Sequence, residues 1–286
     1  MGGLGNQMFQ YAVGRAISFR NNVKLKLDLS WYTNDDSRIY KLKYFNIIED
    51  YASKEEIDFI KPKRSQIAKW IIHQFKQRFF PYYLKPLVNE DGFSFNPKIL
   101  KIKDDSYLNG YWQSELYFSD CASIIRNDFT LKLKLDKNNM KFLDEIRSSN
   151  SISLHIRRGD YYFNKKTRQV HGTLPLNYYY SALNILSNLV HNPIIYVFSD
   201  DIQWAKHNLK LTLPSRFMDF NMANYDYIDL TLMSMCKYHI IANSSFSWWG
   251  AWLAQYKGKI VIAPKRWFAK CEVDSSSLFP NDWILI

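Results

Sequence analysis

The sequence predicts an α/β protein, and three observations support this fold class. The chain has 286 residues, of which 47% are hydrophobic and 17% aromatic, so it holds enough apolar side chains for a substantial core. Between residues 150 and 286, short apolar runs alternate with longer segments of helical periodicity. Such alternation is typical of parallel βαβ units, in which helices connect the strands of an open sheet.

The second half of the chain gives the clearest succession of elements. Residues 151–156 alternate polar and apolar side chains as a strand does, and the apolar run 194–198 predicts a second strand. Asp201 is placed to cap a helix that ends near Leu209. Further strands are predicted at 216–220, 239–242 and 259–263, and further helices at 176–189, 227–236 and 244–256.

The first half of the chain has a weaker pattern. Residues 9–20 predict a helix, residues 23–29 alternate as a strand does, and a further strand is expected at 107–111. The short polar run 147–150 contains Ser149, near which we place the boundary between a domain of residues 1–149 and one of residues 150–286.

The chain carries a formal net charge of +11, and part of this excess is concentrated in one stretch. Residues 61–89 hold seven basic residues and no acidic one, with apolar residues at helical spacing between them and Pro81 placed to end the helix. We expect the apolar side of this helix to cover the core and its cations to face solvent. Peripheral docking of residues 61–85 on an anionic membrane surface is the alternative. The apolar positions are Ile67, Trp70, Ile71, Phe75 and Phe79.

The cysteines and the amino terminus favour a cytoplasmic protein. Cys121, Cys236 and Cys271 are dispersed without C-x-x-C spacing, which predicts neither a disulfide framework nor a cysteine zinc site. The chain opens with glycines in place of the charged and apolar segments of a signal peptide. Prolines and asparagines interrupt the uncharged stretch 174–199, and an asparagine and three serines interrupt 238–256, so neither is expected to span a membrane.

Two of the predicted strand ends carry groups that bind anions. Ligands of open α/β sheets bind outside the carboxyl ends of the strands. Arg157 and Arg158 follow the first strand, and guanidinium groups form strong bonds to phosphoryl oxygens. Ser244 and Ser245 open a helix whose first N–H groups offer a second anion site at the same edge. We therefore expect a diphosphate here, against the alternatives of an Arg158–Asp160 surface pair and of simple capping by Ser244.

The strand end between these two carries Asp200 and Asp201. A carboxylate matches the donor pair of a guanine base, and Asp200 is the better candidate because Asp201 is placed to cap. The alternative is that both are capping or turn residues. No cluster of His, Cys or acidic residues has metal-ligand spacing, so no metal is expected. Near the amino terminus, Gly5 and Asn6 are expected in a loop that approaches a ligand, before the helix that starts at Phe9.

Three motifs carry a resemblance to a known family. They are HIRRGDY at 155–161, GGLGNQMFQYA at 2–12 and IIANSSFSWWGAW at 240–252, and together they span most of the chain. In this combination and order the sequence resembles the α-1,2-fucosyltransferases of glycosyltransferase family 11. Members of that family begin with a short apolar strand before the glycine motif, whereas here Met1 directly precedes Gly2.

The resemblance implies a GT-B architecture of two Rossmann-like domains facing across a cleft. Residues 150–286 would bind GDP-β-L-fucose, residues 1–149 would form the acceptor side, and no other cofactor is implied. It also implies inverting, metal-independent transfer of L-fucose to the 2-hydroxyl of a terminal galactoside, on an oligosaccharide or a lipid-linked glycan.

The resemblance also implies roles for individual residues. Arg158 would bind the donor diphosphate with Arg157 and His155 in support, and Asp200 matches an acidic position used for guanine. Asp160 is the candidate general base, or else it orients Arg158. The remaining donor contacts expected are Ser244, Ser245, Phe246, Gly5 and Asn6.

Two functions of other classes remain open at this point. The net charge and the aromatic content are compatible with a nucleic-acid-binding protein, although no RNA-binding motif accompanies the basic stretch. A non-catalytic sugar-binding protein is the other alternative, and the intact anion-site residues argue against it.

Overall fold

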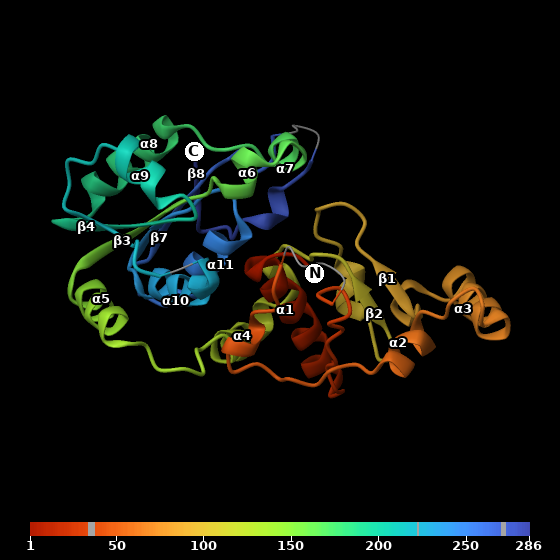
Figure 1. The fold of residues 1–286 in the computed structure, drawn as a ribbon. Helices are drawn as coiled ribbons and strands as arrows, with labels where there is room; N and C mark the ends of the chain where they lie inside the picture. The colour runs from red at the N-terminus through yellow and green to blue at the C-terminus, as the bar shows by residue number, and fades with distance from the viewer. Residues whose placement is uncertain (34–37, 222, 270–272) are drawn as a thin grey trace. The chain divides into compact units, whose positions relative to one another are not determined.

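The computed structural model describes residues 1–33, 38–221, 223–269 and 273–286, and Figure 1 shows the path of the chain. The chain divides into two compact units, which we describe separately. Unit 1 comprises Met1–Lys132 and Asp274–Phe279, and unit 2 comprises Leu133–Val273 and Pro280–Ile286. In both sheets of the described residues every strand pairing is parallel, which confirms the prediction of an α/β fold with parallel sheets.

Unit 2 is built on a parallel sheet with the strand order β5-β4-β3-β6-β7-β8. Its strands are β3 (Asn150–Ile156), β4 (Pro193–Ser199), β5 (Ser215–Phe217), β6 (Tyr238–Ile240), β7 (Ile260–Ala263) and β8 (Ile284–Leu285). Strands β4 and β5 extend the sheet to one side of β3, whereas β6 to β8 extend it to the other. The strand order therefore reverses between β3 and β6, and such a reversal leaves a ligand-binding crevice at the carboxyl ends of the strands.

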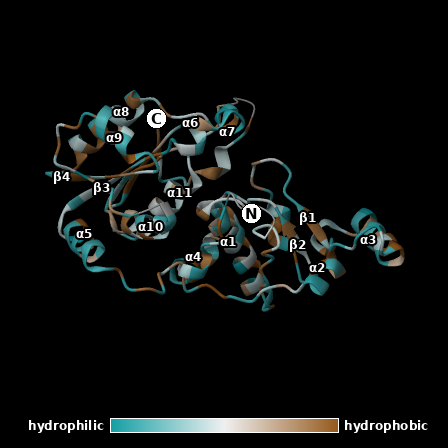
Figure 2. Ribbon diagram, in the orientation of Figure 1, coloured by the Kyte–Doolittle hydropathy of each residue, from teal (hydrophilic) through white to brown (hydrophobic). Residues whose placement is uncertain are grey.

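Helices pack on both faces of this sheet. Ile195 and Val197 of β4 lie in a buried cluster with α8 and α9, whereas Tyr196 and Phe198 lie in a second cluster with α5 and α10. Figure 2 shows the hydrophobic strands of the sheet among these helices. The helices of unit 2 are α5 (Lys137–Ser148), α6 (Gly159–Phe163), α7 (Lys165–Val170), α8 (Leu176–Leu189), α9 (Ile202–Asn208), α10 (Asp226–Met235) and α11 (Ser245–Leu253).

Unit 1 is organised around helix α1. Its helices are α1 (Leu4–Asn21), α2 (Lys54–Ile60), α3 (Ile67–Phe79) and α4 (Ala122–Asp128), and its strands are β1 (Leu87–Asn89) and β2 (Tyr107–Asn109). The buried carboxylate of Asp128 accepts hydrogen bonds from the Tyr11 hydroxyl at 2.7 Å and from Arg15 Nε at 3.0 Å. These two bonds join α1 to the end of α4.

The division between the units lies earlier in the chain than the boundary expected near Ser149. It falls between Lys132 and Leu133, because Leu143 and Ile146 of α5 are buried against unit 2. The amphipathic helix α5 is absent from the predicted elements, and the polar run at 147–150 only joins it to β3. The chain also returns to unit 1 near its end, where the Ser277 hydroxyl accepts a hydrogen bond from the backbone N–H of Phe95 at 2.8 Å.

Two predictions for the first half of the chain are wrong. Residues 23–29 form no strand, and their only ladder contact among the described residues is an isolated bridge between Leu27 and Tyr51. β2 pairs with β1, and a cavity of about 1170 Å³ is lined both by residues 23–29 and by β2. Helix α1 begins at Leu4 and not at Phe9, which places Gly5 and Asn6 in a helical turn and not in a loop. The strand expected at 107–111 is present as β2.

Helix α3 matches the predicted helix, but its environment differs from the expectation. Its C-cap is Phe80, directly before Pro81, as predicted. The expected burial of its apolar side is wrong, because Ile67, Phe75 and Phe79 are 67%, 56% and 63% exposed. This apolar side therefore does not cover the core of unit 1.

The described cysteines Cys121 and Cys236 are both buried thiols, and Cys271 lies outside the described residues. Within the described ranges, no helix combines the length and the apolar character needed to cross a bilayer.

Tyr178 offers a direct test of how α8 is attached to the sheet. Its buried hydroxyl donates to the carbonyls of Ile241 at 2.7 Å and Ile262 at 3.3 Å. Tyr178→Phe leaves these carbonyls with fewer donors and should lower the free energy of unfolding by about 1–2 kcal/mol in urea titrations. Tyr180→Phe removes a hydroxyl that accepts the solvent-side N–H of Lys210 as its one bond within the described residues, and it should change stability by less than about 0.5 kcal/mol. Equal effects of the two variants would contradict this assignment.

Candidate functional site

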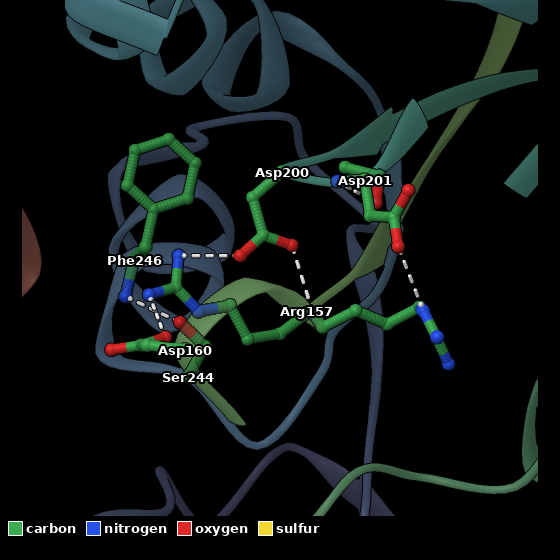
Figure 3. Close-up of polar contacts among 8 residues, drawn as sticks. Arg157, Asp160, Asp200, Asp201, Ser244 and Phe246 are labelled. Carbon is green, nitrogen blue, oxygen red and sulfur yellow. Dashed lines mark hydrogen bonds and ion pairs between the residues drawn. The ribbon is translucent and has the colours of Figure 1, made fainter. Parts of the chain in front are cut away.

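The ends of β3, β4 and β6 bring charged and small polar residues together at the switch point of the unit 2 sheet. β3 lies between β4 and β6 in the sheet, so the three carboxyl ends are adjacent. Figure 3 shows Arg157, Asp160, Asp200 and Ser244 gathered in one cluster, with Asp201 and Phe246 beside them. The sequence prediction that these strand ends converge is thus confirmed for unit 2.

Arg157 is the centre of this cluster. Its Nη2 lies 2.6 Å from Asp160 Oδ1 and its Nη1 lies 3.2 Å from Asp200 Oδ2, so two carboxylates fix the guanidinium plane. The guanidinium carbon also lies 5.2 Å from the centre of the Tyr161 ring. The buried Nε of Arg157 has no hydrogen-bond partner among the described residues. The Arg157 side chain is 20% exposed and its oriented Nη groups have further N–H donors, so the guanidinium is suited to bind an anion.

Arg158 points away from Arg157, which corrects the expectation of a paired guanidinium fork. Its Nε lies 3.1 Å from Asp201 Oδ2, and its guanidinium carbon lies 3.8 Å from the centre of the Trp204 ring. The Tyr162 ring lies 4.4 Å away. Adjacent residues of an extended chain point to opposite sides, so neighbouring arginines after a strand do not converge. The clamp by rings and carboxylate nevertheless fixes the direction of the Arg158 guanidinium.

Asp160 contacts Arg157 and not Arg158. The surface pair between Arg158 and Asp160 that the sequence left open as an alternative is therefore wrong, and so is the orienting role of Asp160 toward Arg158. Asp160 lies in the first turn of α6, which turns its carboxylate back toward the residue three positions earlier.

Asp200 holds the turn after β3. Its Oδ1 accepts the backbone N–H of Arg158 at 2.8 Å, and its Oδ2 contacts Arg157. A Cβ atom on Gly159 would lie only 2.3 Å from this Oδ2, so glycine is required for the close approach of the carboxylate. Asp201 caps α9 by accepting the N–H of Trp204, as predicted. Asp200 therefore has a clear structural task at the position predicted to recognise guanine.

His155 connects the arginine cluster to the start of α11. Its ring centre lies 5.4 Å from that of Phe246. Burial, together with the positive charge of Arg157, lowers the pKa of His155 to about 3, so the imidazole is neutral near pH 7. Its Nδ1 is buried and has no partner among the described residues. Figure 3 shows the Arg157 guanidinium on the side of Ser244 and Phe246, where α11 begins.

The start of α11 is built as the sequence predicts. Ser244 is the N-cap, and its hydroxyl accepts the N–H of Phe246 at 3.3 Å. The buried Ser247 donates to the carbonyls of Ala242 and Ser244, and Asn243 donates to three backbone carbonyls. These bonds fix the turn between β6 and α11. Ser245 occupies the first helical position, where backbone N–H groups point out of the helix.

Gly5 and Asn6 lie in unit 1, apart from the unit 2 cluster in the division of the chain. The side-chain oxygen of Asn6 accepts a hydrogen bond from Gln113 Nε2 at 2.9 Å. The next residue, Gln7, is buried and bonds to the backbone of Gly2, Ile39 and Lys41. In this unit the glycine motif fixes local chain geometry.

Asp229 in α10 is a carboxylate that the sequence analysis misses. Burial, with a contribution from Asp226, raises its pKa to about 7, although Asn221 donates to its Oδ1 at 2.6 Å. Asn221 in turn forms a reciprocal amide pair with the buried Asn139. Helices begin at the carboxyl edge of a parallel sheet, so the first turns of α10 lie at the same edge as Ser244. Asp229 lies inside the predicted helix 227–236 and belongs to no motif, and the feature that distinguishes it is burial, which appears only in the folded chain.

The charges of the cluster nearly cancel. Two guanidiniums face the three carboxylates of Asp160, Asp200 and Asp201, so these side chains together carry one excess negative charge. An anion would therefore be held by the direction of N–H donors and not by net charge. In the part of the chain that the structure describes, no three His, Cys, Asp or Glu residues are grouped to hold a metal ion.

Comparisons with known proteins agree with the motifs. Residues 1–286 match the family described as Glycosyl transferase family 11. An Escherichia coli protein named alpha-1,2-colitosyltransferase is 38% identical over 290 residues, covering 100% of this chain and 96% of that relative. The Escherichia coli O-antigen biosynthesis glycosyltransferase WbnK is 34% identical over 298 residues, covering 99% of this chain and 97% of that relative. The solved fucosyltransferase NodZ from Bradyrhizobium is 14% identical with a TM-score of 0.48, covering 87% of this chain and 89% of NodZ.

The buried neutral His155 predicts a measurable pH dependence of stability. Its pKa is about 3 in the folded chain and about 6.5 when unfolded, so the unfolded state alone takes up a proton between these values. For each pH unit below about 6.5, the free energy of unfolding of the wild type should therefore fall by about 1.4 kcal/mol more than that of His155→Gln. Urea unfolding of the wild type and the variant at several pH values measures this difference. Asp229, whose raised pKa contributes with the opposite sign, is present in both proteins and cancels in the comparison.

His207→Gln is the matched control, because this histidine is exposed on α9. The control should keep the wild-type pH slope. An unchanged slope in His155→Gln would show that the imidazole is not buried in its neutral form.

Proposed function

The chain belongs to glycosyltransferase family 11, and from this premise we propose that it transfers L-fucose from GDP-β-L-fucose to the 2-hydroxyl of a terminal galactoside. Family membership makes the chain a glycosyltransferase, in place of a nucleic-acid-binding protein or a non-catalytic lectin. The proposal that the donor is a nucleotide sugar bound in unit 2 rests on one observation. The oriented Arg157 guanidinium lies beside the start of α11, at the switch point of the unit 2 sheet.

In this proposal the two units take the roles of the two domains of a GT-B enzyme. The unit 2 sheet, within the predicted domain of residues 150–286, binds the donor. Unit 1, within the predicted domain of residues 1–149, supplies the acceptor side. The acceptor is an oligosaccharide or lipid-linked glycan that ends in galactose, which accords with the O-antigen biosynthesis named for one relative.

The donor diphosphate binds between Arg157 and the first turn of α11. As the bond between fucose and GDP breaks, negative charge accumulates on the β-phosphate. Arg157 and the N–H groups after Ser244 and Ser245 are oriented before the reaction, so they stabilise this charge without reorganising. Arg158, clamped between two rings, contributes a second, more distant guanidinium. No divalent cation is required in this scheme, because N–H donors take its part.

Asp160 and Asp200 act on the donor through Arg157. Both carboxylates contact the guanidinium, and Asp200 also holds the Arg158 backbone, so we assign both as positioning residues. A general-base role for Asp160 would require its carboxylate to leave this pair when the acceptor hydroxyl arrives.

The guanine base is recognised by a carboxylate at the same edge of the sheet. Asp200 is the candidate from the sequence, but its two oxygens already accept bonds from the arginine turn. Asp229 is the better candidate, because its Oδ1 accepts one bond, from Asn221, and burial raises its pKa. The N1–H and amino groups of guanine would supply further donors. Phe246 of α11 and Ile228 of α10 both pack against the buried apolar cluster that contains Leu232 and Met233.

The role of Arg157 is tested by substitution. Arg157→Ala should lower kcat by about two to three orders of magnitude under saturating donor, the usual loss for one electrostatic stabiliser of a transition state. Arg158→Ala should cost less, about one order of magnitude. Arg157→Lys keeps the charge without the planar fork and should fall between wild type and Arg157→Ala.

Arg147→Ala on α5 is the control, because that arginine is exposed in the last turn of α5, beside the start of β3 and not its carboxyl end. Its rate should equal that of the wild type. A wild-type kcat in Arg157→Ala, with the thermal midpoint preserved, would remove Arg157 from the transition state.

The donor sugar has a second candidate, colitose, because one relative is named a colitosyltransferase. Colitose is L-fucose without its 3-hydroxyl, so the two donors share the same diphosphate and base. We expect kcat/KM to favour GDP-fucose, with transfer unchanged in EDTA and the α-1,2 linkage visible by NMR. If colitose is transferred faster than fucose, colitose is the donor sugar, and the proposed diphosphate site is unchanged. Activity lost in EDTA and restored by a divalent cation would contradict the metal-independent mechanism.

A further inference from the structure

Helix α3 presents an apolar face to solvent. None of its 13 residues is buried, and Ile67, Ile71, Ile72, Phe75 and Phe79 are each more than half exposed. At about 100° per residue these five positions fall on one side of the helix, in a continuous strip. The rings of Phe75 and Phe79 lie 4.8 Å apart within it. Figure 2 shows hydrophobic and hydrophilic residues side by side along α3.

The orientation of this strip is fixed by the opposite side of the helix. Trp70, His73 and Gln77, which are spaced at i, i+3 and i+7, are the half-buried residues of α3. Gln77 Nε2 donates to the carbonyl of Leu87 at 2.6 Å, and Gln77 Oε1 accepts the N–H of Leu87 at 3.3 Å. A polar contact therefore attaches the helix to β1, and the apolar strip faces outward.

Cations border the apolar strip. Lys69 and Lys76 fall beside Ile72 on one margin, and Arg78 falls on the other margin in the last turn. The Arg78 guanidinium carbon lies 5.6 Å from the centre of the Phe79 ring. Within the described residues, none of these three cations pairs with a carboxylate. Lys63 and Arg64 add exposed positive charge just before the helix.

We infer that α3 is an interfacial helix that docks unit 1 on an anionic lipid surface. Five large apolar side chains gain free energy by leaving water for the acyl-chain boundary. The flanking lysines and arginine reach lipid phosphates, to which each basic residue adds attraction. A helix of 13 residues is about 20 Å long, too short to cross a bilayer, so it lies along the surface.

Charge argues against a second copy of this chain as the occupant. Two such faces brought together would place their basic margins against each other, with no acidic residue between 61 and 89 to compensate. Lipid phosphates supply the missing negative charge over the whole length of the helix. The inference does not depend on which donor or acceptor the enzyme uses.

Vesicle sedimentation tests this docking with the full chain. The protein should bind vesicles containing phosphatidylglycerol, bind pure phosphatidylcholine vesicles far more weakly, and release at high salt. Phe79→Ser should weaken partitioning about tenfold because it removes one ring from the strip. The double variant Lys69→Glu, Lys76→Glu should weaken it about thirtyfold or more.

Two control variants test whether vesicle binding depends on α3 itself or only on the total charge and the exposed apolar surface of the protein. Leu189→Ser on α8 removes an apolar side chain that is 60% exposed, close to the 63% of Phe79. The double variant Lys137→Glu, Lys141→Glu on α5 makes the same change in net charge. Both should bind vesicles like the wild type. Equal losses in the controls, or wild-type binding in the α3 variants, would overturn the proposal. So would self-association without lipid that Phe79→Ser abolishes, because it would assign the face to a second copy.

Discussion

The ion pairs between Arg157 and the carboxylates of Asp160 and Asp200 are the constraint on which the site depends. They join residues from the ends of two neighbouring strands, and Asp200 also holds the backbone of the turn between Arg157 and Gly159. Without a side chain at Gly159, the carboxylate approaches closely enough to fix both. The direction of the Arg157 guanidinium toward the start of α11 follows from this network and not from the charge of the cluster.

The sequence predicts the local features of unit 2 well, because those features depend on neighbouring residues. The alternation of apolar runs and helical segments anticipates β3, β4 and β6, and Asp201 is recognised as a cap from its position after a strand. Features that depend on distant partners are not predicted. The opposite directions of Arg157 and Arg158 are set by Asp200, Asp201 and Trp204, which come from other elements.

Burial explains the other differences between sequence and structure. Asp229 has no motif around it, and only its surroundings in the folded chain raise its pKa. Helix α5 belongs to unit 2 because Leu143 and Ile146 are covered by it, which a polar run in the sequence does not indicate. The apolar pattern of α3 predicts a helix correctly but cannot state which surface that pattern meets. Tertiary structure decides whether such a strip faces a core, as in α8, or solvent, as in α3.

Both proposals place directed donors where an anion arrives. In unit 2, guanidinium and N–H groups meet a diphosphate, and in unit 1, lysines and arginine beside an apolar strip meet lipid phosphates. The claim that the donor diphosphate binds between Arg157 and α11 is tested most directly by a crystal structure of the protein with GDP bound. The measured quantities are the distances from the β-phosphate oxygens to Arg157 and to the first N–H groups of α11. We predict hydrogen-bond distances of about 3 Å to both. A diphosphate bound at another edge of the sheet, with the Arg157 pairs unchanged, would contradict the account.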